Sequence, residues 1–155
     1  MRRTITVIAT AVVTMLAAAP ALAGSPAEHA VADFMSGPFH VQFTASRAAN
    51  APADAATGTF VARAAIGSVG LTTLEGPVTC LDIRGVHLGL FYPVTSSDPS
   101  FLGKAIHGVY IYVTDNLAGK AESVNFLPTS ARTASTCPPV PGIFPITSGT
   151  ATFSP

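Results

Sequence analysis

Val109-Tyr110-Ile111-Tyr112-Val113-Thr114 is the stretch that most clearly specifies a β-strand in this sequence. Aliphatic β-branched residues alternate with tyrosine or threonine, so successive side chains would face opposite sides of a sheet. We therefore predict a strand within residues 104–114. The turn-forming pair Asp115-Asn116 follows it, and a second strand is predicted over residues 121–127.

The same two-residue period recurs along most of the chain. Further strands are predicted over residues 39–46, 57–66, 68–74, 77–84, 86–94 and 146–153. The segments 68–74 and 77–84 are either two strands or one strand bent at Gly76-Pro77. Residues 128–145 contain five prolines and cannot form a central strand. About seven or eight short strands with frequent turns indicate an all-β fold. We predict a small antiparallel β-barrel, because closure leaves no exposed edge strand; a β-sandwich is the alternative.

The N-terminus has the pattern of a secretory signal peptide over residues 1–23. Arg2 and Arg3 are followed by an apolar stretch, a proline and the small-residue cleavage site Ala21-Leu22-Ala23. The apolar stretch is too short for a typical membrane-spanning helix. We therefore expect a secreted or envelope-associated protein with no stable membrane span after cleavage. Removing 23 of the 155 residues leaves 132, the size of one domain.

Residues 24–37 precede the predicted β domain, which we place at residues 38–155. Ser25-Pro26-Ala27-Glu28 fits a capping box, and apolar residues then recur with a helical period. We predict a short helix over residues 26–35.

The charge of the mature chain argues against two classes of partner. After residue 23 there are six basic and eight acidic residues, a net charge of −2, with no block of either sign. Binding to nucleic acid or to an anionic membrane requires a basic surface that neutralises phosphates. We therefore expect neither partner. The sequence also lacks the common metal, nucleotide and nucleophile motifs, and we expect no cofactor or metal.

Cys80 and Cys137 are the two cysteines of the chain. In an oxidising compartment such a pair forms one disulfide, and we predict that bond here. A reactive or metal-binding pair is the alternative, but such sites usually have closer spacing. Cys137 precedes Pro138-Pro139-Val140-Pro141, which we interpret as a covering loop beside the disulfide rather than as a proline-rich ligand.

The segment Gly76-Pro77-Val78-Thr79-Cys80-Leu81-Asp82-Ile83-Arg84-Gly85 resembles a strand of a group of small secreted actinobacterial proteins. Their later Val-x-Asp-Asn turn, loop cysteine and closing strand correspond here to 113–116, Cys137 and 149–153. The resemblance spans roughly residues 38–155 and implies a secreted β domain. The glycine-rich acidic stretch usual in that group is reduced here to residues 117–122. The group has no assigned activity, so the resemblance implies none.

His107 is the histidine with the most suggestive surroundings. It shares a predicted strand face with Val109, Ile111 and Val113, which usually indicates a structural residue with a hydrogen-bond partner. A catalytic alternative pairs it with Asp82, predicted on the face that carries Cys80, as general acid and base.

Tyr110 and Tyr112, with His107, are candidate ligand-binding residues, although strand tyrosines more often brace an outer face. The hydrophobic content of 48% favours a non-enzymatic secreted domain that binds a small apolar ligand or a protein. Two alternatives remain: an isomerase-like or cyclase-like enzyme that uses His107 and Asp82, and a structural component of the cell envelope.

Overall fold

A computed structural model describes residues 27–66, 70–97, 106–116 and 120–155. The predicted signal peptide lies outside these ranges. In the described ranges the chain is all-β, and its one helical element is the 3-10 turn η1 (Ala53–Ala55). Among the described residues, no helix has the length and apolar character needed to cross a bilayer.

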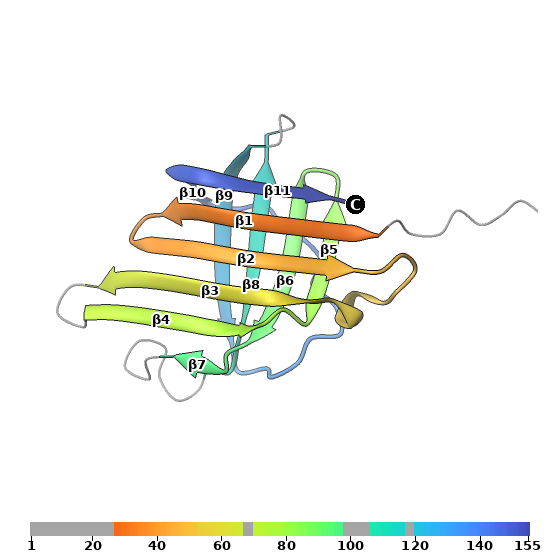
Figure 1. Cartoon of the computed structure of the whole chain (residues 1–155), viewed down its shortest axis with the longest axis horizontal. Helices are drawn as coiled ribbons and strands as arrows, with labels where there is room; N and C mark the ends of the chain where they lie inside the picture. The colour runs from red at the N-terminus through yellow and green to blue at the C-terminus, as the bar shows by residue number, and fades with distance from the viewer. Residues whose placement is uncertain (1–26, 67–69, 98–105, 117–119) are drawn as a thin grey trace, which may run out of the picture.

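The strands form two antiparallel sheets (Figure 1). Sheet A has the order β11-β1-β2-β3-β4-β7, and sheet B has the order β10-β9-β8-β6-β5. The strands of sheet A are β1 (Glu28–Ser36), β2 (Phe39–Arg47), β3 (Thr57–Ile66), β4 (Gly70–Pro77), β7 (Ser96–Ser97) and β11 (Ser148–Ser154). The strands of sheet B are β5 (Cys80–Arg84), β6 (His87–Pro93), β8 (Gly108–Asp115), β9 (Ala121–Thr129) and β10 (Phe144–Pro145).

The all-β prediction is confirmed, and the preference for a barrel is wrong. The two sheets do not close on one another; they face each other as a sandwich whose strands cross steeply (Figure 1). The preference rested on the need to protect edge strands. Here two edges are made by the two-residue strands β7 and β10, and very short edge strands offer little template for pairing.

The predicted N-terminal helix over residues 26–35 is also wrong. Residues 28–36 form β1, which pairs with β2 on one side and β11 on the other. Ala30, Ala32 and Phe34 are buried at alternate positions, while Val31 is 42% exposed on the opposite face. The apolar residues of this segment fit both a helical period and a two-residue period, and pairing with two neighbouring strands selects the extended form.

The main core lies between the sheets. Its largest fully buried side chains include Phe34, Val41 and Phe60 from sheet A. Sheet B contributes Leu81, Leu90 and Ile111, which lie side by side on β5, β6 and β8. The inward alternation of β8 agrees with the sequence pattern, since Val109, Ile111 and Val113 are all buried in this core.

A second, smaller core covers the outer face of sheet B. Residues 130–143, here called the strap, cross this face and are joined to β5 by the Cys80–Cys137 disulfide. Phe91, Ala134 and both cysteines are buried there, with Tyr110 packed against them. The predicted disulfide is therefore confirmed.

The strap passes very close to the sheet at Gly89. A Cβ atom at that position would lie 2.1 Å from the carbonyl oxygen of Cys137 and 3.1 Å from Pro139 Cα. Farther along, the amide of Gly142 donates a hydrogen bond to Thr114 Oγ1 at 2.9 Å. Sheet B is thus covered on both faces, which explains the almost unbroken apolar run of β6.

Candidate ligand-binding site

Two adjoining apolar hollows lie between the sheets. The outer hollow has a volume of about 300 Å³ and the inner one about 230 Å³. Both are lined by Phe39, Phe126 and Phe144, so they adjoin one another, and together they are here called the apolar groove. One wall comes from sheet A and the other from β6, β8, β9 and β10 of sheet B. In Figure 1 the left ends of β3 and β4 extend beyond β9 and β10.

The three shared phenylalanines come from three different strands. Phe39 opens β2 directly after the turn at Gly37, whose φ of 55° favours glycine. Its ring packs against that of Phe126, with ring centroids 5.5 Å apart. Phe144 pairs with Val124 in the short edge strand β10 and remains 48% exposed. Phe144 therefore forms part of the rim and is accessible to a ligand.

The small side chain of Ala62 accounts for part of the space in the inner hollow. Ala62 of β3 lines this hollow opposite the sheet B row Tyr92, Val109 and Pro128, which occupy paired positions on three neighbouring strands. Leu74 of β4 completes the wall next to Ala62. An alanine in this position leaves a volume that a longer aliphatic side chain would fill.

The hydroxyl groups at the outer hollow are already engaged. Ser36 Oγ donates a hydrogen bond to the carbonyl of Pro145 at 3.0 Å. Thr147 Oγ1 donates to the carbonyl of Met35 at 3.2 Å. These bonds fix the segment around β10 against β1, and they leave mainly apolar surface to face the hollow.

Tyr92 is the polar side chain in the described lining of the inner hollow. It is 1% exposed, and its ring stacks on Phe60 with centroids 4.0 Å apart. Burial raises the pKa of its phenol above the ordinary value, so the group stays neutral and keeps its proton. No hydrogen bond joins the Tyr92 hydroxyl to another described residue.

Tyr92 also lines the inner hollow. Among the described residues, the unpaired side-chain oxygens that are fully enclosed are Thr72 Oγ1 and Asp115 Oδ1. The Tyr92 oxygen is not one of these two, although the residue as a whole is only 1% exposed.

His107 and Asp82 are not brought together. His107 lies just before β8 at the end of the sheet, with Nε2 3.4 Å from an Arg132 nitrogen. Asp82 lies on the outer face of β5, and its register neighbour on β8 is Tyr112, five residues from His107. Five residues of extended strand span about 17 Å. Asp82 instead accepts two hydrogen bonds from Arg84, at 2.7 and 3.2 Å.

Tyr110 and Tyr112 lie on the outer face of sheet B, away from the apolar groove. Their rings are stacked with centroids 6.1 Å apart, and Tyr110 also packs on Phe91 at 4.9 Å. Burial is the larger cause that raises the pKa of Tyr112, and the neighbouring Tyr110 raises it further. The structure thus places Tyr110 against the strap and Tyr112 beside Tyr110 on the same outer face.

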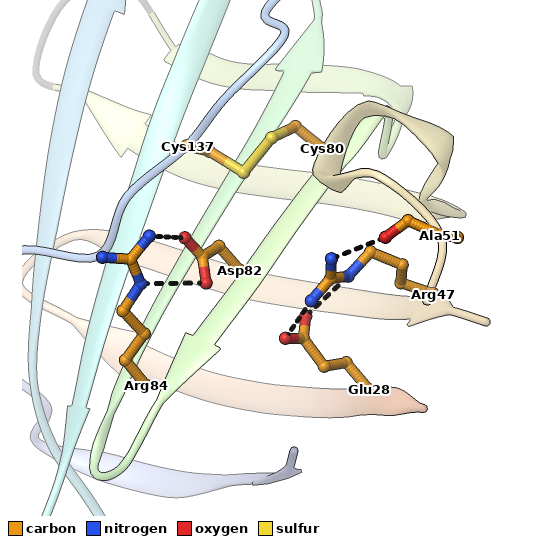
Figure 2. A network of polar contacts seen from close by, with 7 residues as sticks. All are labelled: Glu28, Arg47, Ala51, Cys80, Asp82, Arg84 and Cys137. Atoms are coloured by element: carbon orange, nitrogen blue, oxygen red, sulfur yellow. Dashed lines mark hydrogen bonds and ion pairs between the residues drawn. A yellow bond between two sulfur atoms is a disulfide. The ribbon is translucent and has the colours of Figure 1, made fainter. Parts of the chain in front are cut away.

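A polar cluster lies at the other end of the sandwich (Figure 2). Arg47 forms a two-pronged ion pair with Glu28 and also donates to the carbonyl of Ala51 at 2.8 Å. The Asp82–Arg84 pair lines the same hollow of about 430 Å³. The Glu28–Arg47 pair is largely buried, with side-chain exposures of 4% and 12%, whereas Arg84 is 67% exposed.

An exposed polar cluster on the outer face of sheet A was not apparent from the sequence. His40 Nε2 lies 2.6 Å from Asp33 Oδ1, and Gln42 donates to Asp33 Oδ2 at 2.9 Å. The hydrogen bonds from His40 and Gln42 lower the pKa of Asp33. The pairing of β1 with β2 brings these residues together, and β1 was expected to be a helix.

The described residues contain no group of three or more His, Cys, Asp or Glu side chains that could hold a metal ion. The apolar groove is therefore the feature whose shape and chemistry best suit a ligand. Comparisons with protein-family models, with curated proteins and with solved structures return no match, so the chemistry of the groove is inferred from its own residues.

Proposed function

We propose that this protein is exported and acts as a non-enzymatic binding domain that holds a small apolar molecule in the apolar groove. The observation that carries the proposal is the pair of adjoining hollows lined by Phe39, Phe126 and Phe144. Small-molecule sites are typically concave and mainly apolar, with a few polar groups, and their volumes begin at about 300 Å³. The groove has these properties.

The rim supports the same proposal. Phe144 is 48% exposed and its neighbour Ile143 is 66% exposed, so apolar surface continues from the groove to the outside. Exposed apolar surface that adjoins a concave site is a common feature of binding sites. The volume suits a small molecule better than a folded partner.

The two alternatives have less support. An isomerase-like or cyclase-like activity was tied to a His107–Asp82 pair, and the two residues lie about 17 Å apart along the strands of sheet B. His107 lines neither hollow of the groove. A structural envelope role gives no reason for an open apolar groove between the sheets.

Binding of the neutral dye N-phenyl-1-naphthylamine tests the proposal. The wild-type protein is expected to bind this dye and raise its fluorescence. Phe144→Ser should weaken dye binding about five- to tenfold. Phe144 is 48% exposed, so about half of its side-chain surface is available to contact the dye, and the substitution removes that apolar contact. Titration of dye fluorescence gives the dissociation constants.

Leu127→Ser is the matched control. Leu127 is 52% exposed, close to the value for Phe144, but it pairs with Tyr110 on the outer face of sheet B. Dye affinity should stay within twofold of wild type in this variant. Equal losses in both variants would show that the dye binds elsewhere. If none of the three proteins binds the dye, the small-molecule proposal fails and a protein partner replaces it.

Export is tested separately by N-terminal sequencing. Expressed with its full leader in a bacterium, the protein should be recovered outside the cytoplasm with Gly24 at or near its N-terminus, because Ala21-Leu22-Ala23 fits the signal peptidase site. Recovery of secreted protein that still begins at Met1 would contradict cleavage at this site.

A further inference from the structure

We infer that Tyr92 orients the ligand, so that the groove selects uncharged molecules with an apolar body and one hydrogen-bonding group at the inner end. This inference rests on the proposed function and adds the chemical class of the ligand. It arises from the one polar side chain in the described lining of the inner hollow.

The position of the Tyr92 ring is fixed before any ligand arrives. Phe60 stacks on it at 4.0 Å with an interplanar angle of 16°. On another side, a Cβ atom at Gly76 would lie 2.9 Å from Tyr92 Cδ2, so glycine allows β4 to approach the ring closely. A ring held by such contacts presents its hydroxyl in one direction, which is the requirement for orienting a ligand.

The hydroxyl has an unmet capacity for hydrogen bonding. It has no hydrogen-bond partner among the described residues, and Tyr92 lines the inner hollow. A phenol both donates and accepts, so an alcohol, a phenol, a ketone or an ester on the ligand could pair with it. Such a bond would satisfy a group that is otherwise only poorly solvated in an apolar site.

The rest of the described lining disfavours a charged ligand. Ala62, Leu74, Val109 and Pro128 surround Tyr92, and none can neutralise a charge. Moving a carboxylate or an ammonium group into such surroundings carries a large desolvation cost with no opposite charge to offset it. The inner end of the ligand should therefore be neutral.

Two nearly isosteric probes test the role of the hydroxyl. The affinities of 4-ethylphenol and 4-ethyltoluene are measured by displacement of N-phenyl-1-naphthylamine. In the wild-type protein 4-ethylphenol should bind about two- to tenfold more tightly, the value of one neutral hydrogen bond. In Tyr92→Phe the ratio should fall to about one, while the affinity for 4-ethyltoluene stays within twofold. The anion 4-ethylbenzoate should bind more weakly than 4-ethyltoluene in both proteins.

Thr72→Val is the matched control. Thr72 is 2% exposed and its hydroxyl is also unpaired, but it lines neither hollow. This variant should keep the wild-type ratio. Chemical shifts of the Leu74 and Val109 methyl groups should respond to 4-ethylphenol, whereas those of Leu127 on the outer face should not.

Three outcomes would overturn the inference: an unchanged ratio in Tyr92→Phe, an equal loss of both ligands in that variant, or tighter binding of 4-ethylbenzoate than of 4-ethyltoluene by the wild-type protein. Each can occur while the dye still binds in a Phe144-dependent manner, in which case the proposed function stands and the selection rule fails. Absence of dye binding would remove both.

Discussion

Replacing both Cys80 and Cys137 with alanine is expected to lower the free energy of unfolding by about 4 kcal/mol. The disulfide closes a loop with a sequence separation of 57 residues, and the chain-entropy relation gives this value for a loop of that length. Total stabilities of small domains are on the order of 5–15 kcal/mol, so the change would be a large part of the total. Urea unfolding of the oxidised wild type and the double variant measures it.

The structural consequence of that change is specific to the strap. Phe91 is fully buried under the disulfide on the outer face of sheet B, and the strap lies against Gly89. Loosening of the strap should expose Phe91 before the main core opens. Ser135→Ala, an exposed change in the same strap, is the control and should alter stability by less than about 0.5 kcal/mol. A loss below 1 kcal/mol in the double variant would contradict a stabilising disulfide.

Glu28→Gln is expected to cost about 3 kcal/mol. The substitution leaves the Arg47 guanidinium, only 12% exposed, without its opposite charge, and removal of one partner from a buried ion pair typically costs about 3–5 kcal/mol. The carbonyl of Ala51 still accepts one hydrogen bond from Arg47, which favours the lower end of that range. Urea unfolding again provides the measurement.

Two companion variants separate the charge effect from packing. Asp82→Asn breaks the pair with Arg84, whose side chain is 67% exposed, and should cost less than about 1 kcal/mol. The double variant Glu28→Leu/Arg47→Leu removes both buried charges and should recover most of the loss. Equal costs for Glu28→Gln and Asp82→Asn would show that burial of the first pair does not determine its contribution.

The sequence predicted the strands well, because most of them have one buried and one exposed face. In β2 and β3 the inward side chains Val41, Phe43, Phe60 and Ala62 all lie at alternate positions, as their two-residue period indicated. The disulfide was also predictable, since the chain has two cysteines and export would place them in an oxidising compartment.

Elements that depend on long-range pairing were not predictable. Glu28 was interpreted as a helix-capping residue, whereas it begins β1 and pairs with Arg47 across the β1–β2 ladder. When a segment fits both a strand and an amphipathic helix, the strands that pair with it decide which one forms. The local sequence pattern does not show which strands those are. The barrel was preferred because closure would protect the edge strands, and the two-residue strands that form two of the edges leave almost no periodic signal in the sequence.

The candidate site was harder to predict than the fold. Tyr110 and Tyr112 were singled out because they lie in the clearest strand, but they lie on the outer face of sheet B, away from the groove. Tyr92, Phe126 and Phe144 lie on three different strands and become neighbours only in the folded groove. The position of Tyr92 opposite Phe60 depends on how the two sheets cross.

The disulfide makes a closed covalent ring out of most of sheet B. Residues 80–137 include all of β5, β6, β8 and β9, whereas β1 to β4 and β11 lie outside the ring in the chain. A protease that cuts one peptide bond between residues 81 and 136 therefore leaves two pieces that remain joined through sulfur. The nicked molecule keeps its full mass until a reductant is added. A single cut between residues 36 and 80, or between residues 137 and 148, instead leaves a fragment with strands of sheet A that has no covalent link to the ring.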